Sequence, residues 1–211
     1  MSYVLNKSTL EKACRELAGR DSDLAFVYKM YGAPPLWDRS EGFATLLQII
    51  LEQQVSLASA KACFDKLCLR LGKPAPENII RSSDSELRAD GFSRQKSTYA
   101  RHLAEAVVEK RIDLENLKNL TDEEVKSELI KLKGIGEWTS DIYLLMAMLR
   151  PDIMPKGDLA LHIAYQKLTV AENRPGSDEF LLNAEKWKPY RSVAARLLWH
   201  FYLSQKVRQT I

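Results

Sequence analysis

The chain has 211 residues, of which 45% are hydrophobic and 28% charged, with 9 glycines and 8 prolines. This balance is typical of a globular protein that buries a core, and it excludes an intrinsically disordered chain and a collagen-like chain. The formal net charge of +3 is too small to identify a polyanionic partner by itself.

The apolar segments of the sequence are all short. The longest uninterrupted apolar run, 142–149, is far below the roughly 18 residues needed to cross a bilayer. The start of the chain also lacks the apolar centre of a signal peptide. We therefore expect an intracellular protein with no membrane partner, located in the cytoplasm or nucleoid of a bacterial or archaeal cell, or in the nucleus of a eukaryotic one.

Apolar residues recur at helical spacing along the chain, and Ser, Thr, Asp, Gly or Pro stands at the breaks. No segment has the alternation of a strand, so the sequence predicts an all-α fold. In chain order, the predicted helices cover 9–18, 23–31, 42–53, 57–71, 93–110, 122–131, 137–149, 158–168 and 190–207, with shorter pieces near Ile79 and Leu87. Segments 33–35, 73–76 and 151–157 are predicted to connect helices, because proline cannot continue one.

The cysteines, Cys14, Cys63 and Cys68, are predicted to be thiols of the core. They cannot all pair, and no C-x-x-C pair or histidine at ligand spacing accompanies them. The pattern therefore predicts no disulfide framework, no zinc or iron-sulfur site and no metal ligand.

The segment 121–149 predicts two helices joined by a short hairpin. Thr121 and Glu124 have the spacing of a capping box that opens the first helix, and Gly134-Ile135-Gly136 interrupts the helical pattern before the second. Both glycines are expected to allow positive φ, and Ile135 is expected to fill the crevice between the helices. Backbone amides at such a hairpin bind phosphate without reading sequence. The alternative is a C-cap glycine followed by a tight turn.

Asp158 is a candidate for two compatible roles. It follows a Pro-Lys-Gly loop and precedes apolar residues at helical spacing, as a helix N-cap does. Capping amides and the helix dipole favour the ionised form of an aspartate, so the same residue can also act as a fixed carboxylate in catalysis. Asp141, in the middle of a helix, and Asp152, in a loop without this context, are weaker candidates.

The last segment of the chain, 183–211, is basic. It would suit nucleic acid, although solvated helix faces often carry as much positive charge. The segment contains one anion, Glu185, and the following cations: Lys186, Lys188, Arg191, Arg196, Lys206 and Arg208.

Four separated segments carry a family resemblance: FATLLQIILEQQVS at 43–56, LKGIGEWTS at 132–140, PKGDL at 155–159 and WKPYRSVA at 187–194. In this order they resemble the motifs of the helix-hairpin-helix-GPD superfamily of DNA glycosylases, and most closely its alkylbase (3-methyladenine) DNA glycosylase II branch. Longer members have an additional N-terminal β domain, for which the residues before Phe43 leave no room. The resemblance therefore implies the short form, with a single glycosylase domain over 1–211.

The resemblance implies a role for each matching side chain. Asp158 becomes the catalytic carboxylate, while Trp138 and Trp199 line a pocket for a purine that alkylation has made cationic. Gln54 matches the wedge that enters the duplex when the nucleotide is extruded, although a plain loop glutamine is the alternative.

The partner that the resemblance implies is double-stranded DNA containing alkylated bases, bound by a monomer. A structural monovalent cation at the hairpin would be compatible with it, and no other cofactor is implied. Lys133 is either a phosphate contact or a solvated charge, and Lys96 is expected to be a solvated charge. The implied DNA-binding residues are Gln53, Gln54, Ser56, Lys133, Gly134, Ile135, Gly136 and Thr139.

The residue at position 138 indicates the type of reaction. Related enzymes that also cut the backbone have a nucleophilic lysine there, and tryptophan cannot replace it. The expected activity is therefore monofunctional: hydrolysis of purines of the 3-methyladenine and 7-methylguanine type from double-stranded DNA, which starts base excision repair. The alternatives are a bifunctional glycosylase/lyase and a non-catalytic hairpin protein that binds damaged DNA. We expect a DNA-binding cleft between two lobes, one of about 41–150 and one of about 1–40 plus 156–211.

Overall fold

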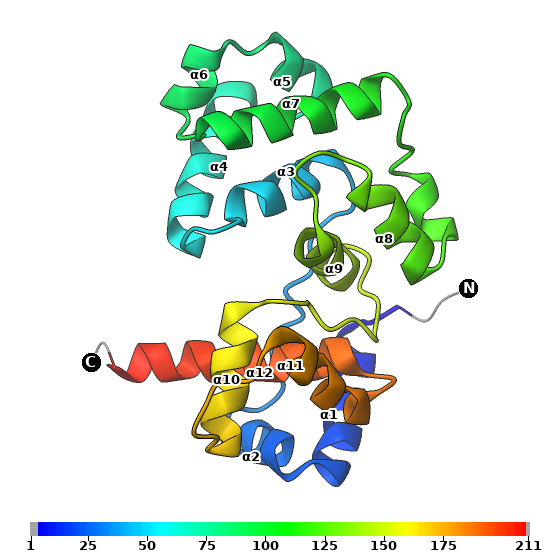
Figure 1. Ribbon diagram of the computed structural model, residues 1–211, viewed down its shortest axis with the longest axis vertical. Helices are drawn as coiled ribbons and strands as arrows, with labels where there is room; N and C mark the ends of the chain where they lie inside the picture. The colour runs from blue at the N-terminus through cyan, green and yellow to red at the C-terminus, as the bar shows by residue number, and fades with distance from the viewer. Residues whose placement is uncertain (1–3, 210–211) are drawn as a thin grey trace. The chain divides into compact units, whose positions relative to one another are not determined.

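The computed structural model describes residues 4–209, with the side chains of 206–209 excepted. Every regular element within this range is a helix, which confirms the predicted all-α fold (Figure 1). Among the described residues, no helix combines the length and apolarity of a membrane span. The chain divides into two compact units, of which unit 1 is Met1–Asp38 with Leu144–Ile211 and unit 2 is Arg39–Tyr143.

Unit 2 is built around α3. This helix is apolar over most of its length, and Leu46, Leu47, Ile49 and Ile50 are completely buried. It packs against α4 and α7, and α7 packs in turn against α5. The elements are α3 (Phe43–Glu52), α4 (Leu57–Leu71), α5 (Pro76–Arg81), α6 (Asp84–Ala89), α7 (Arg94–Val108), η1 (Asn116–Asn119) and α8 (Asp122–Ile130), followed by the first part of α9 (Glu137–Met146).

Unit 1 is built around α12, which packs against α1, α2 and α10. The successive residues 192–199 of α12 are all buried, so this helix is surrounded by protein at its centre. In Figure 1, α12 (red) crosses α10, the helix with which it packs. The elements are α1 (Lys7–Arg20), α2 (Ser22–Tyr31), the end of α9, α10 (Leu159–Thr169), α11 (Ser177–Ala184), η2 (Glu185–Trp187) and α12 (Arg191–Gln209).

Asp21 ties the N-terminal helices of unit 1 to the segment before α12. Its Oδ1 caps α2 by accepting from the amides of Asp23 and Leu24, and its Oδ2 accepts from Trp187 Nε1 at 2.8 Å. Burial alone would raise the pKa of this carboxyl, but the hydrogen bonds from Lys186, the Leu24 amide and Trp187 lower it below its ordinary value. Asp21 therefore contributes stability as an ion.

The structure differs from the predicted elements at three places. Helix α11 was not expected from the sequence, although Asp178 and Glu179 in its first turn are a typical start signal. The segment 73–76 is only partly a connector, because Pro76 is the first residue of α5, where a missing amide hydrogen costs nothing. The helix predicted over 137–149 ends at Met146, and Leu149 has a left-handed backbone with φ of 53°.

The basic segment before the C-terminus is not a free basic face within the described residues. Arg196 is completely buried, and it donates to the carbonyl oxygens of Leu36, Ser192 and Leu145. Burial lowers the pKa of this guanidinium to about 10. The other described cations form ion pairs within unit 1: Lys186 with Asp21, Lys188 with Glu185, and Arg191 with Asp152 and Glu185. The side chains of Lys206 and Arg208 lie outside the described residues.

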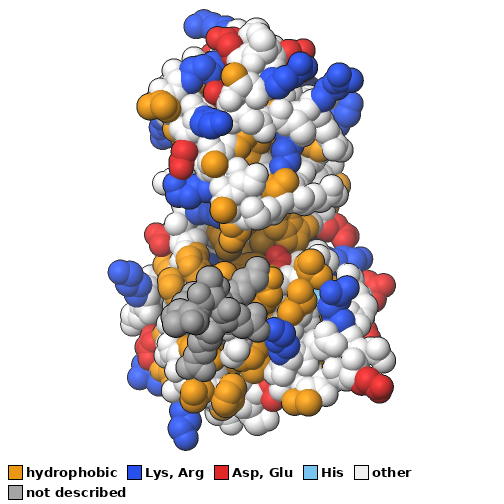
Figure 2. Space-filling view, turned by 90° about the vertical axis from the view of Figure 1, so that its left-hand side faces the viewer, with side chains coloured by type: hydrophobic (Ala, Val, Ile, Leu, Met, Phe, Trp, Pro, Cys, Tyr) orange, Lys and Arg blue, Asp and Glu red, His pale blue; other side chains and the backbone are white. Residues whose placement is uncertain are grey.

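The charged side chains on the face drawn in Figure 2 are scattered, with lysines and arginines among acidic and uncharged neighbours. This distribution agrees with the small net charge of +3. A nucleic-acid surface on this protein must therefore depend on local geometry more than on a large excess of positive charge.

Candidate functional site

Asp158 is held in place from two directions. It is the N-cap of α10, directly after Gly157, whose φ of 74° turns the chain into the helix. The carboxylate oxygen Oδ1 accepts one hydrogen bond from the Leu161 amide at 3.0 Å and another from Trp199 Nε1 at 3.2 Å. Only 9% of the residue is exposed. The predicted N-cap is confirmed, and the structure brings Asp158 together with Trp199.

An unanticipated aromatic residue, Trp37, packs against Trp199. Its ring meets the ring of Trp199 edge to face, with centroids 6.4 Å apart and planes at 75°. Trp199 itself is only 8% exposed, whereas Trp37 is partly exposed. Of these two tryptophans, Trp37 therefore presents the larger share of exposed aromatic surface. No helical pattern surrounds Trp37, and an aromatic residue in a connector was the only signal in the sequence.

The backbone around Trp37 is fixed, although it forms no helix. Trp37 has a left-handed φ of 50°, a conformation that is costly for a bulky residue and that needs support from its surroundings. Buried Arg196 supplies such support by donating from Nε to the carbonyl oxygen of Leu36 at 2.9 Å. The basic residue that seemed suited to nucleic acid therefore holds the segment that carries Trp37.

The hairpin in unit 2 has two glycines with different functions. Gly134 has a φ of 90°, and a Cβ built on it would lie 2.5 Å from Cδ2 of Tyr99, so only glycine fits there. Gly136 does not have positive φ, and a Cβ built on it would meet nothing within 4 Å. The expectation of positive φ is confirmed for Gly134 and wrong for Gly136, where the exposed backbone is open to an approaching group.

The rest of the hairpin agrees with the predicted helix-hairpin-helix. Thr121 and Glu124 form the expected capping box at α8, and Ile135 is buried with 5% exposed. An ion pair between Lys126 and the buried Asp141 joins α8 to α9. Asp141 therefore has a structural partner, as Asp152 has in Arg191. Lys133 is exposed before the hairpin, and its contact with phosphate stays a prediction.

The loop between α3 and α4 lies against this hairpin within unit 2. Gln53 donates from Nε2 to the carbonyl oxygen of Gly134 and to Oγ1 of Thr139, both at 2.8 Å. Thr139 is 2% exposed. Its hydroxyl therefore has Gln53 as a partner inside the protein. Gln54 is exposed with a left-handed φ of 56°, and Ser56 caps α4 through the Ser59 amide. Their roles in DNA binding stay predictions.

Lys96 is not the solvated charge expected from the sequence. It is partly buried, and its Nζ donates to the carbonyl oxygen of Leu51 in the last turn of α3. Burial lowers the pKa of this ammonium group below its ordinary value. The reason is local, because a helix end leaves carbonyl groups that need a donor from elsewhere.

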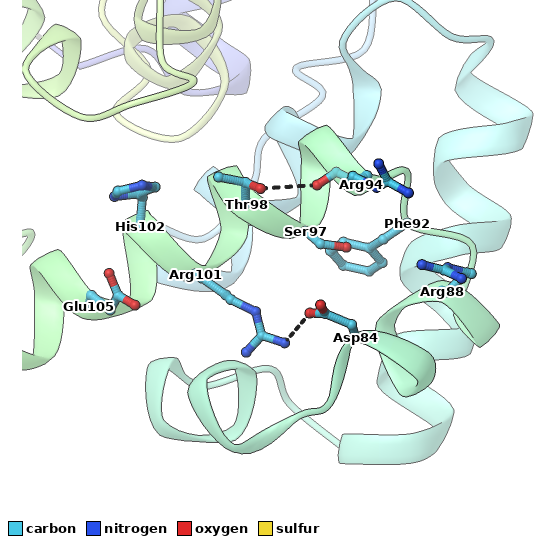
Figure 3. Close-up of a pocket in the computed structure, with 9 residues that line it drawn as sticks. All are labelled: Asp84, Arg88, Phe92, Arg94, Ser97, Thr98, Arg101, His102 and Glu105. Atoms are coloured by element: carbon cyan, nitrogen blue, oxygen red, sulfur yellow. Dashed lines mark hydrogen bonds and ion pairs between the residues drawn. The ribbon is translucent and has the colours of Figure 1, made fainter.

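A pocket of about 320 Å³ lies on unit 2 between α6 and α7, and none of the predicted site residues lines it. Figure 3 shows Arg101 pointing across it to Asp84. Arg101 also donates to the Ser82 carbonyl at 2.7 Å, so it holds the turn between α5 and α6. The pocket is therefore a charged surface groove with a structural arginine, and Phe92 and His102 are the aromatic side chains in its lining.

Trp138 lies in the first turn of α9 in unit 2 and is partly exposed. The described residues contain no group of three or more His, Cys, Asp or Glu side chains that could hold a metal ion. The groups that the described residues supply are the fixed carboxylate of Asp158, the tryptophan rings and the backbone amides of the hairpin.

These features define a helical protein with a helix-hairpin-helix in unit 2 and, in unit 1, a carboxylate that caps α10 and accepts a hydrogen bond from Trp199. Residues 47–189 match the family described as HhH-GPD superfamily base excision DNA repair protein. Since the match covers more than half of the chain, the chain belongs to the HhH-GPD superfamily.

Individual relatives agree with this assignment. The chain is 32% identical over 200 residues to DNA-3-methyladenine glycosylase 1 of Schizosaccharomyces pombe, covering 91% of this chain and 87% of that protein. It is 26% identical to YfjP of Bacillus subtilis over 84% of its own length, and it spans 65% of the length of YfjP. Among solved structures, the S. pombe 3-methyladenine DNA glycosylase Mag1 in complex with abasic DNA superposes with a TM-score of 0.83. The identity there is 28%, with 92% of this chain and 97% of Mag1 covered.

Proposed function

We propose that this protein is a monofunctional DNA glycosylase that hydrolyses the N-glycosidic bond of alkylated purines, of the 3-methyladenine and 7-methylguanine type, in double-stranded DNA. The observation that carries the proposal is the carboxylate of Asp158, held between the start of α10 and Trp199 Nε1. A protein that only binds damaged DNA has no need for a positioned carboxylate beside an aromatic surface.

The carboxylate suits the charge that develops in this reaction. Departure of a base from its sugar builds positive charge on C1′, and a fixed anion stabilises the oxocarbenium-like transition state. Two donors already hold Oδ1 of Asp158, so little reorganisation is needed when the charge appears. The same carboxylate can orient the attacking water.

The aromatic rings suit the substrate. Alkylation at a ring nitrogen makes the purine cationic, and aromatic faces attract cations by about 0.5 to 2 kcal/mol each. Trp199 donates to Asp158 and packs edge to face with Trp37, and we propose that Trp138 adds a further aromatic contact to the base. Trp138 also stands where lyase relatives need an amine nucleophile, so the product is an abasic site in an uncut strand.

The hairpin and the neighbouring loop supply the binding of DNA. We propose that the open backbone at Gly136 contacts phosphate and that exposed Gln54 fills the gap left by the extruded nucleotide. In this proposal the two units belong to a single glycosylase domain, which acts as a monomer on one duplex. The protein acts in the cellular compartment that contains the DNA.

The test is the release of free bases from DNA treated with a methylating agent, resolved by chromatography. We expect 3-methyladenine and 7-methylguanine in the soluble fraction and strands that stay intact until the abasic sites are cleaved by alkali. Absence of free base at high enzyme concentration, with DNA binding retained, would favour the non-catalytic alternative.

A further inference from the structure

Gln53 is the last residue before the proposed wedge, Gln54. Its side chain bonds to residues that are far away in the sequence. It ends α3 in an extended conformation, and Gln54 follows with its left-handed backbone. Its amide nitrogen donates to Gly134, 81 residues away, and to Thr139, 86 residues away, both at 2.8 Å. A primary amide carries two hydrogens, so these two bonds occupy its full donor capacity.

The two acceptors belong to parts of the hairpin that are packed against other residues of unit 2. Gly134 lies against the ring of Tyr99 from α7, so closely that no Cβ fits between them. Thr139 is buried in the first turn of α9. Gln53 therefore bonds to both sides of the exposed backbone at Gly136, and the loop and the hairpin are connected through one side chain.

Few residues can make this connection. Asparagine is shorter by one methylene group, and glutamate has no hydrogen to donate to a carbonyl oxygen. Methionine has nearly the same length and shape without the donor. The connection therefore depends on the amide hydrogens of Gln53. A methionine at this position removes the donor while filling nearly the same volume.

We propose that Gln53 is a positioning residue that couples extrusion of the nucleotide to the hairpin's contact with phosphate. The inference rests on the proposed function of the hairpin and the wedge loop. Once the hairpin binds the backbone, the bonds of Gln53 fix where Gln54 enters the duplex relative to that phosphate. Without them, the loop tip with its left-handed residue is free to relax, while the hairpin, held by Tyr99, still binds DNA.

The exposed residues of the loop agree with this role. Val55 is 45% and Leu57 62% exposed, although both are apolar. They flank Ser56, which caps α4, so the loop presents short apolar side chains next to Gln54. When the wedge enters the duplex, apolar side chains beside it can be buried against the stacked bases.

The experiment compares Gln53→Met with Gln48→Met, a control on the same helix whose amide makes only a long bond of 3.4 Å to Glu52. The probe is a duplex with 2-aminopurine beside a tetrahydrofuran analogue of an abasic site, whose fluorescence rises when a wedge unstacks the neighbouring base. We expect Gln53→Met to lower the amplitude at saturating protein at least about fivefold, the effect of losing both hydrogen bonds. Affinity for undamaged duplex should stay within about threefold, and Gln48→Met should match the wild type.

Two comparisons separate positioning from a general loss of structure. Excision from methylated single strands needs no extrusion against a partner base, so Gln53→Met should reduce the rate on duplex much more than on single strands. In a Gln54→Ala background, Gln53→Met should reduce the fluorescence amplitude no further, because the wedge it positions is gone.

The proposal is overturned if the wild type produces no fluorescence rise, if Gln53→Met unstacks the probe like the wild type, or if it lowers duplex and single-strand excision equally. Base release tests the proposed glycosylase activity, whereas fluorescence tests the role of Gln53, so either result can be negative without the other. A wild type that unstacks the probe but releases no base contradicts the proposed glycosylase, and the fluorescence of the variants still decides the role of Gln53.

Discussion

Substitution by alanine should have different effects on the free energy of unfolding at the two glycines of the hairpin. At Gly134, alanine must adopt a φ of 90°, which costs about 1 to 2 kcal/mol. Its Cβ also meets the Tyr99 ring at 2.5 and 2.6 Å, and such overpacking costs about 1 to 3 kcal/mol more. We expect Gly134→Ala to lower the free energy of unfolding by about 2 to 5 kcal/mol. At Gly136 neither cost applies, so Gly136→Ala should change it by no more than about 0.5 kcal/mol.

Urea denaturation followed by circular dichroism measures both values, and salt titrations of DNA binding complete the test. Gly136→Ala should fold normally but bind damaged and undamaged duplex more weakly by a similar factor, because the methyl group intrudes at a backbone contact. Equal destabilisation by the two variants would refute the assigned geometry of the hairpin. If Gly136→Ala keeps full affinity for undamaged duplex, the hairpin is a structural turn and does not bind phosphate.

Three further predictions address recognition, mechanism and stability. Trp37→Ala and Trp199→Ala should each lower the preference for methylated over unmodified duplex by about 2- to 30-fold while leaving the salt dependence of binding unchanged, and an altered salt slope would contradict a role in the base pocket. Borohydride added during turnover should trap no covalent adduct, because Trp138 cannot form a Schiff base; a trapped adduct would establish a lyase. Asp21→Ala should lower the free energy of unfolding by about 2 to 4 kcal/mol at pH 7, from a lost N-cap and an orphaned Trp187 Nε1. Because the pKa of Asp21 is lowered in the folded protein, its ionic contribution is present above about pH 4 and is lost as the pH falls further, so urea titrations at several pH values should show a shrinking difference between variant and wild type.

The sequence predicted best those features that depend on neighbouring residues. The capping box of Thr121 and Glu124 and the N-cap at Asp158 are formed within a single helical turn, so their spacing is visible in the chain. The same holds for the positive φ of Gly134, which follows from a short hairpin.

Features that depend on distant residues were not predictable in this way. The sequence gives no indication that the carbonyl of Leu51 takes the ammonium of Lys96, or that Arg196 is buried under three carbonyl groups. Trp37 is adjacent to Trp199 only because the segment before unit 2 folds back onto α12. Each of these contacts joins elements whose packing is decided by the whole core, and residue type alone does not specify it.

The central claim, that Asp158 supplies the chemistry, is tested most directly by single-turnover excision at one defined 7-methylguanine in a duplex. Wild type and Asp158→Asn are compared, and affinity for the abasic product is measured in parallel. The amide can still accept the hydrogen bonds from Leu161 and Trp199, so we predict an unchanged fold and product affinity within about threefold, while the rate falls by about two orders of magnitude or more because no anion offsets the charge at C1′. An Asp158→Asn rate within about tenfold of the wild-type rate would contradict the account, because the residue would then be a helix cap and not the catalytic carboxylate.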